Sequence, residues 1–194
     1  LPGTRATIAD LAWLRSRGLD RTVAAHVAAG RPLLGICGGF QMLGRTVDDS
    51  AGIEGAAAEA DGLCLLDVET NFFATKTLRL SEGQWRSAPC SGYEIHHGRV
   101  TCGPGAEEFL GGVRAGQIFG TMWHGAFEGD ELRARFLQET LGLAPSGVSF
   151  PRAREQRLDL LGDLIEKWLD VDALGELVRS GPPPGLPFLP PGAP

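Results

Sequence analysis

Lysine is almost absent from the 194-residue sequence, which contains only Lys76 and Lys167. Lysine and arginine form no cluster, and the formal net charge is -6. Proteins that bind nucleic acid usually present a basic patch, so this composition argues against such a partner. No apolar run approaches the roughly 18 to 20 residues that cross a membrane, and no signal-peptide pattern opens the chain. We therefore expect a soluble, cytoplasmic protein with neither nucleic acid nor membrane as a partner.

Cysteine is too sparse and too irregularly spaced to form a disulfide scaffold. No two cysteines form a C-x-x-C pair, which argues against a structural zinc site. His96 and His97 lie between two of the cysteines, but their spacing matches no standard zinc pattern, and we expect no metal. The cysteines are Cys37, Cys64, Cys90 and Cys102.

The first quarter of the chain alternates between helix-like and strand-like patterns. Apolar spacing predicts helices over 7–17 and 21–29, with Asp20 as the N-cap of the second. Residues 33–36 form a short apolar run that is typical of a buried parallel strand, and a helix over 39–45 follows.

This alternation of helix-like and strand-like patterns indicates an α/β fold with an open, mostly parallel sheet flanked by helices. Residues 1–4 have the pattern of a strand end entering a turn, with no strand before it. We therefore expect the opening strands of the sheet to be missing and the chain to be N-terminally truncated.

The middle of the chain is interpreted as strands joined by loops. Residues 48–62 are rich in Ala, Gly and acidic residues without a clear period, and they are predicted to form a loop. Apolar patterning predicts strands at 63–70, 75–80, 92–100 and 117–125, and a helix at 132–141.

The C-terminal third contains one amphipathic helix, predicted over 154–169, and a second short helix over 171–178. The apolar face of the first helix, mostly leucine, is interpreted as packing surface rather than a site. The residues that follow are dominated by proline and cannot sustain a helix or a central strand. The sequence thus predicts a domain over 1–179 and a Pro-rich tail over 180–194.

Cys37 is the first candidate for chemistry, because it stands where a predicted buried strand meets a helix. Gly38 and Gly39 turn the chain directly after it. A side chain on such a sharp turn is similar to the nucleophile elbow of other enzymes. A helix N-terminus behind the thiol would lower its pKa and favour the reactive thiolate. The alternative is that Cys37 is a small buried apolar residue, since free cysteine is often fully buried.

His124 is the candidate base for this thiol, because a cysteine nucleophile needs a base near neutral pH. It comes at the end of the apolar run over 117–125, and the carboxyl ends of parallel strands share the edge where sites form. His96 and His97 lie on an extended segment whose two faces point in opposite directions. The sequence leaves open whether either of them lines the site.

The sequence G-I-C-G-G-F-Q-M-L-G at residues 35–44, with the late histidine His124, resembles the class I (triad-type) glutamine amidotransferase family. Members of this family hydrolyse glutamine to supply ammonia. Stretches 1–11, 92–99 and 120–127 narrow the resemblance to the branch that amidates corrinoids in cobalamin biosynthesis. The second of these, which contains Y-E-I-H-H-G-R, is the most specific. The resemblance covers almost the whole chain and identifies the predicted domain as the glutaminase domain.

The resemblance implies a catalytic role for four residues. Cys37 would attack the side-chain amide of glutamine and form a γ-glutamyl thioester, while His124 transfers the protons. The developing oxyanion needs fixed N–H donors, and the backbone N–H groups of Gly38 and Gly3 match those positions.

The resemblance also implies a set of residues that bind glutamine. Gln41, one helical turn after the cysteine, would hydrogen-bond the substrate. His96, His97 and Gly98 would shape the pocket around it.

One departure from the family concerns the third catalytic residue. Most triad amidotransferases carry a Glu two residues after the histidine to orient it, and here that position is Ala126. The corrinoid branch shares this absence. Another group must then orient His124, and Glu94 and Glu128 are the candidates.

A second departure is the absence of a G-x-x-x-x-G-K-[ST] phosphate-binding loop. The resemblance implies an N-terminal synthetase domain of the same enzyme, which would use ATP and magnesium to amidate carboxylates of adenosylcobyrinic acid a,c-diamide. The glutaminase domain would need no cofactor of its own, and cobalt would enter only within the corrinoid substrate. The fragment by itself would hydrolyse glutamine at most.

Several alternatives stay open at this point. The chain could belong to cobyrinic acid a,c-diamide synthase or lipid II isoglutaminyl synthase, although Y-E-I-H-H-G-R argues against both. A cysteine hydrolase or peptidase with the same fold would carry Gln41 only by coincidence. An inactive interaction domain is also consistent with Ala126 and the missing strands.

Overall fold

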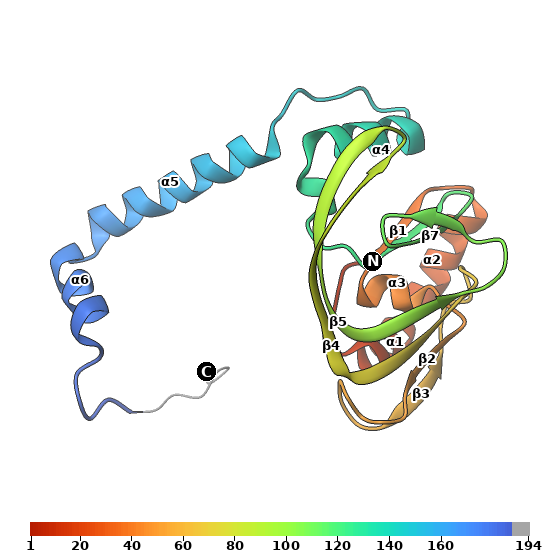
Figure 1. Ribbon diagram of the computed structural model, residues 1–194, viewed down its shortest axis with the longest axis horizontal. Helices are drawn as coiled ribbons and strands as arrows, with labels where there is room; N and C mark the ends of the chain where they lie inside the picture. The colour runs from red at the N-terminus through yellow and green to blue at the C-terminus, as the bar shows by residue number, and fades with distance from the viewer. Residues whose placement is uncertain (188–194) are drawn as a thin grey trace. The chain divides into compact units, whose positions relative to one another are not determined.

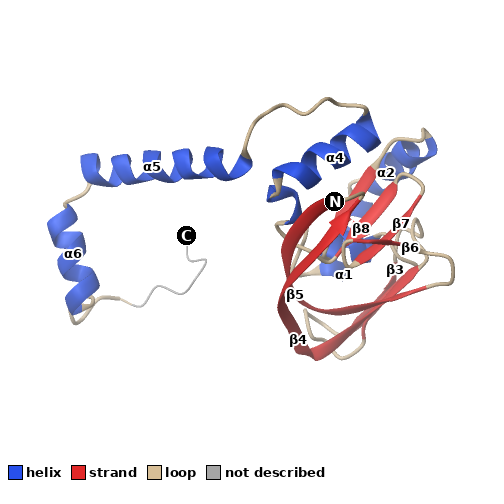
Figure 2. Ribbon diagram, turned by 45° about the horizontal axis from the view of Figure 1, so that its top comes forward, coloured by secondary structure: helices blue, strands red, loops and turns tan. Residues whose placement is uncertain are grey.

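The computed structural model describes residues 1–187, which fall into two compact units. The N-terminal unit is Leu1–Val148, and the C-terminal unit begins at Ser149. Figure 1 follows the chain through both units, and Figure 2 marks the helices and strands of each. Each unit is described by itself.

The N-terminal unit combines helices with eight strands. The elements in chain order are α1 (Thr7–Ser16), α2 (Leu19–Ala28), β1 (Leu33–Ile36), α3 (Gly38–Met42), β2 (Thr46–Asp49), β3 (Ala58–Asp61), β4 (Val68–Trp85), β5 (Ala88–Cys102), β6 (Glu107–Phe109), β7 (Gly112–Ala115), β8 (Ile118–Thr121), the 3-10 helix η1 (Ala126–Glu128) and α4 (Asp130–Leu141).

The strands form two four-stranded sheets, in the orders β1-β8-β7-β6 and β3-β2-β4-β5. The predicted α/β class is confirmed, and the predicted parallel strands are found in the pairs β1/β8 and β2/β4. The other strand pairs are antiparallel, so the sheets are mixed rather than mostly parallel. One reason is the two-residue turn Arg86–Ser87, because so short a turn can join only antiparallel strands. It makes β4 and β5 one long, curved ribbon (Figure 1).

Helix α3 packs against strands of both sheets, and all five of its residues are buried. Phe40 on this helix is fully buried and lies over Gly120 of β8, where a Cβ atom would collide with its ring. Only glycine therefore allows α3 to approach β8 so closely. Cys37 belongs to the apolar cluster around Phe40, and a second cluster gathers around Phe119 and Trp123. The segment after β8 thus contributes to both clusters, with Met122 in the cluster of Cys37 and Trp123 in the other.

The predicted helices are all present, with boundaries that shift by a few residues. Asp20 does not cap α2 as predicted. The N-cap is Gly18, which adopts a left-handed φ of 69° that glycine tolerates without strain.

The predicted loop over 48–62 is wrong in part, because β2 and β3 form at its two ends. Their acidic and alanine-rich sequences have low strand propensity, which the pairing of β2 with β4 and of β3 with β2 overrides. The strand predicted from residue 63 begins only at Val68.

The C-terminal unit consists of α5 (Phe150–Trp168) and α6 (Val171–Ser180). The apolar face of α5 was expected to be packing surface, but no described residue of this unit is buried, and Trp168 is 70% exposed. The assignment of this face as packing surface stays a prediction. Of the predicted tail, residues 188–194 lie outside the described part, and the boundary at 179 stays a prediction. Between residues 1 and 187, no helix is both long enough and apolar enough to span a bilayer.

Candidate active site

Cys37 occupies a strained turn between β1 and α3. Its φ of 51° and ψ of -115° lie in a region that non-glycine residues rarely adopt. The turn is fixed on both sides, since the Cys37 N–H donates to the Thr121 carbonyl at 2.8 Å and its own carbonyl accepts from Gln41 at 2.9 Å. This is the geometry of a nucleophile elbow, and it places the thiol at the end of β1 as the C-G-G sequence predicts.

His124 follows β8, the parallel neighbour of β1, and β5 holds it in place. The N–H of His124 donates to the Tyr93 carbonyl at 2.8 Å, and the Tyr93 N–H donates back at 3.0 Å. The Tyr93 ring also stacks on the imidazole, with 5.2 Å between ring centroids and 16° between planes. Tyr93 was not among the predicted site residues. The available signal was that the sole tyrosine of the chain opens the Y-E-I-H-H-G-R stretch.

Gly3 brings Cys37 and His124 together. Leu1 runs beside β1, donating to the Leu34 carbonyl at 2.7 Å and accepting from Ile36 at 3.0 Å. A Cβ atom built at Gly3 would lie 3.0 Å from His124 Cε1 and 3.5 Å from Cys37 Cβ. The Cys37 side chain and the imidazole therefore border the same glycine, and their role as a catalytic pair stays a prediction.

The predicted oxyanion donors lie at this same place. The Gly38 N–H lowers the pKa of the Cys37 thiol, and Gly3 lies against the Cys37 side chain. Their assignment as oxyanion donors stays a prediction.

Cys37 opens onto a polar cavity of about 320 Å³. Two predicted residues, His96 and His97, line it together with a mixture of acidic and basic side chains. The lining residues are Thr4, Arg5, Cys37, Ile53, Glu54, Lys76, Ile95, His96 and His97.

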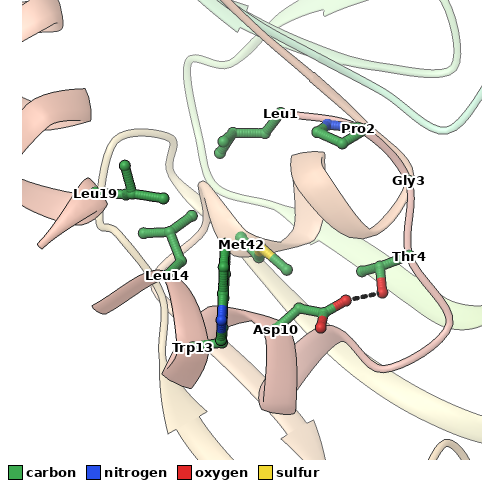
Figure 3. Close-up of a pocket in the computed structure, with 9 residues that line it drawn as sticks. All are labelled: Leu1, Pro2, Gly3, Thr4, Asp10, Trp13, Leu14, Leu19 and Met42. Carbon is green, nitrogen blue, oxygen red and sulfur yellow. Dashed lines mark hydrogen bonds between the residues drawn. The ribbon is translucent and has the colours of Figure 1, made fainter. Parts of the chain in front are cut away.

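A larger cavity, of about 530 Å³, lies on α1 and the segment 1–4 (Figure 3). Its lining is mostly apolar and includes Trp13, Leu14, Leu19 and Met42, beside a hydrogen bond from Thr4 to Asp10. No thiol or imidazole lines it, so the smaller polar cavity is the one equipped for chemistry.

Glu94 orients His96 rather than His124. Its Oε2 lies 3.1 Å from His96 Nε2, while Oε1 accepts from Arg79 Nε at 2.8 Å and from Ser81 Oγ at 2.9 Å. Burial alone would raise the pKa of Glu94, but these hydrogen bonds and the Arg79 charge together lower it. The expectation that Glu94 orients His124 directly is therefore wrong.

Glu128, the other carboxylate proposed to orient His124, lies on η1, which begins two residues after His124. Its assignment stays a prediction.

The remaining predicted binding residues are divided between the cavity and the core. His97 lines the cavity, with Nδ1 2.9 Å from the Phe73 carbonyl. Gln41 is 1% exposed and is not a lining residue, because its Oε1 accepts from Thr7 at 3.2 Å and its Nε2 faces Gly98. Gln41 therefore extends from α3 toward α1 and β5. Its role in binding glutamine stays a prediction.

Residues 1–187 contain no group of three or more His, Cys, Asp or Glu side chains that could hold a metal ion.

The pKa of the Cys37 thiol is raised rather than lowered as predicted. Burial raises the pKa of the thiol, Glu54 raises it further, and the Gly38 N–H and the Lys76 charge lower it only in part. The predicted lowering is wrong because α3 has only five residues and a small dipole, while the thiol is 6% exposed. Burial lowers the pKa of His124, and the His96 charge lowers it further. The two shifts therefore favour the neutral thiol and the neutral imidazole.

Comparison with known proteins places this site in context. Residues 1–132 match the family of CobB/CobQ-like glutamine amidotransferase domains. The cobyric acid synthase of Mycolicibacterium vanbaalenii is 72% identical over 194 residues, covering 100% of this chain and 40% of that protein. The cobyric acid synthases of Mycobacterium ulcerans and Mycobacterium tuberculosis are 70% and 68% identical over 194 and 197 residues, with the same coverage. The chain thus spans about 40% of the length of these curated relatives.

Proposed function

The chain belongs to the family of CobB/CobQ-like glutamine amidotransferase domains, and on that premise we propose that Cys37 and His124 hydrolyse glutamine to supply ammonia within a cobyric acid synthase. The observation that supports the proposal is the strained elbow at Cys37, whose side chain borders Gly3 together with the His124 imidazole.

In the first half of the reaction, Cys37 Sγ bonds to the amide carbon of glutamine and its proton passes to the His124 imidazole. Because both groups rest in their neutral forms, this proton transfer accompanies the attack rather than preceding it. The N–H groups of Gly38 and Gly3 receive the negative charge on the amide oxygen. The imidazolium then returns its proton to the amide nitrogen, the C–N bond breaks, and ammonia leaves.

In the second half, water attacks the γ-glutamyl thioester and gives a proton to His124. The C–S bond breaks, glutamate leaves, and the proton returns to the thiolate. The lowered pKa of His124 supports this step, since a neutral imidazole can act as the base. His124 Nε2 is buried and without a hydrogen-bond partner among residues 1–187, so it is free to exchange a proton.

The proposal assigns glutamine as the substrate of this chain and a corrinoid as the substrate of the whole enzyme. An N-terminal synthetase domain would use ATP and magnesium to activate carboxylates of adenosylcobyrinic acid a,c-diamide, which ammonia then amidates. This chain has no phosphate-binding loop, so no step involving ATP or magnesium is assigned to its residues. Four free cysteines support a reducing compartment such as the cytoplasm.

Glutamate release by the full-length enzyme that contains this chain tests the proposal, with ATP and corrinoid present. Cys37→Ser should abolish glutamine-dependent amidation, while amidation driven by added ammonium salt should continue at the wild-type rate. Cys64→Ser, on an exposed cysteine, serves as the matched control and should keep both activities.

Wild-type protein that releases no glutamate under these conditions would contradict the proposal and favour the inactive interaction domain. Glutamate release that survives Cys37→Ser would assign the chemistry to another residue.

A further inference from the structure

The polar cavity beside Cys37 carries charges of both signs that do not neutralise one another. Glu54, Lys76 and Arg5 all line it. Across residues 1–187, none of the three takes part in a salt bridge. An acid and two bases around one cavity, each without an ionic partner, are suited to a ligand that carries both charges.

Glu54 is held rigidly at the cavity. The buried Asp49 carboxylate accepts from the Ile53 and Glu54 N–H groups at 2.7 and 2.9 Å, which fixes the backbone there. Glu54 Oε2 accepts from the Thr7 N–H, in the first turn of α1, at 3.0 Å. The carboxylate is therefore preorganised, and its other oxygen remains for a donor on the ligand.

Lys76 reaches the cavity because the β4–β5 ladder is interrupted beside it. The register of this ribbon shifts between Phe72 and Thr77, so Lys76 lies in the irregular segment rather than in a paired position. Arg5 approaches from the chain segment just before α1. The two cations thus come from separate parts of the chain.

Both signs of charge act on the nucleophile. Glu54 raises the pKa of the Cys37 thiol, and Lys76 lowers it. These opposite effects support the geometric conclusion that both side chains share one space with the thiol.

We propose that Glu54 binds the α-ammonium group of glutamine, and that Lys76, assisted by Arg5, binds its α-carboxylate. The inference rests on the proposed glutaminase function and names the residues that select a free amino acid. With the γ-amide at Cys37, the two charged groups of the substrate occupy the far part of the cavity. Neither residue was identified from the sequence, since both lie outside the stretches that carry the family resemblance.

A matrix of two variants and three substrates tests this assignment in the full-length enzyme. The substrates are glutamine, glutaramate, which lacks the α-amino group, and 4-aminobutanamide, which lacks the α-carboxylate. The variants are Glu54→Gln and Lys76→Met, and their matched controls are Glu59→Gln on the exposed strand β3 and Lys167→Met. The readout is the kcat/KM for ammonia release.

Glu54→Gln should lower kcat/KM for glutamine about 10- to 100-fold relative to kcat/KM for glutaramate, because a hydrogen bond to a charged group is lost only with glutamine, whereas any change in the thiol acts on both substrates. Lys76→Met should show the same selective loss with glutamine against 4-aminobutanamide. The controls should keep wild-type preferences. Because each preference is a ratio measured on one protein sample, partial unfolding of a variant does not change it.

Equal losses with glutamine and glutaramate in Glu54→Gln would overturn the assignment and leave Glu54 a structural residue. Failure of the proposed function would be seen in a different variant. Glutamine hydrolysis would then persist in Cys37→Ser, whatever substrate preference the Glu54 and Lys76 variants show.

Discussion

Cys37 combines a strained backbone with a buried thiol, and the two properties affect its reactivity differently. The strain fixes where Sγ lies, whereas burial and Glu54 raise the pKa of the thiol. In the proposed mechanism, the protonated thiol is protected from oxidation and becomes nucleophilic when His124 accepts its proton.

Alkylation of Cys37 by iodoacetamide should therefore increase with pH beyond the range of an ordinary cysteine. Glu54→Gln removes a charge that raises the thiol pKa, so its profile should move to lower pH, and Lys76→Met should move it to higher pH. The measurement is the alkylation rate against pH, followed on the Cys37 peptide. A rate that is already constant below neutral pH would indicate a preformed thiolate–imidazolium pair and contradict this account.

Tyr93 is expected to position His124 through its ring rather than its hydroxyl. Tyr93→Phe keeps the stacked ring and should keep kcat, while Tyr93→Ala should lower kcat about two- to tenfold, the worth of one aromatic pair. Steady-state kinetics with glutamine checks this. A loss in Tyr93→Phe equal to that in Tyr93→Ala would shift the role to the hydroxyl.

At the residue scale, the sequence allowed Cys37 and His124 to be predicted because each follows a short apolar strand. It did not allow the state of the thiol or the partner of His124 to be predicted. The state of the thiol depends on burial and on Glu54, and the partner of His124 is Tyr93 of β5, which pairs with the segment after β8.

At the scale of elements, the β4–β5 ribbon connects the site to the fold. Glu94 on β5 is 4% exposed and ties together Arg79 and Ser81 of β4 and His96 of its own strand. This network lies beside the cavity, so it stabilises the wall that carries His96 and His97.

Glu94→Gln should destabilise the protein by about 1–3 kcal/mol at neutral pH, because buried donors lose a charged acceptor. The lowered pKa of Glu94 gives the effect a pH dependence: its contribution is present above the ordinary glutamate pKa and is lost as the pH falls through the folded-state pKa. Denaturant unfolding of wild type and variant at several pH values is the measurement. Glu82→Gln on the exposed face of β4 is the control, and a stability difference that grows in acid would contradict this explanation.

The elements that sequence patterns predict best are those with strong local signals. Leu33–Ile36 and the helices follow apolar periodicity, and the structure has them near the expected places. The strands β2 and β3 were missed, since Thr46–Asp49 and Ala58–Asp61 become strands only by pairing with β4 and with each other. Information of that kind is not local to the sequence.

At the scale of the whole molecule, the site belongs to the N-terminal unit alone. Every predicted site residue lies before Val148, and so does the matched family region. Both buried apolar clusters of the described residues also lie within this unit.

A chain ending at Val148 should therefore unfold cooperatively with a midpoint within about 3 °C of the 194-residue chain, since that interval corresponds to roughly 1 kcal/mol. Thermal unfolding followed by circular dichroism checks this. Loss of the transition in the shorter chain would mean that α5 and α6 are part of the folding unit.

The most direct test of the account is the site of covalent modification by a glutamine analogue that carries an electrophilic diazoketone in place of the amide. Peptide mapping of the full-length enzyme should find a single adduct on Cys37, which excess glutamine prevents and Glu54→Gln slows. An adduct on Cys64, Cys90 or Cys102 instead, or unmodified Cys37 in protein that still hydrolyses glutamine, would contradict the central claim.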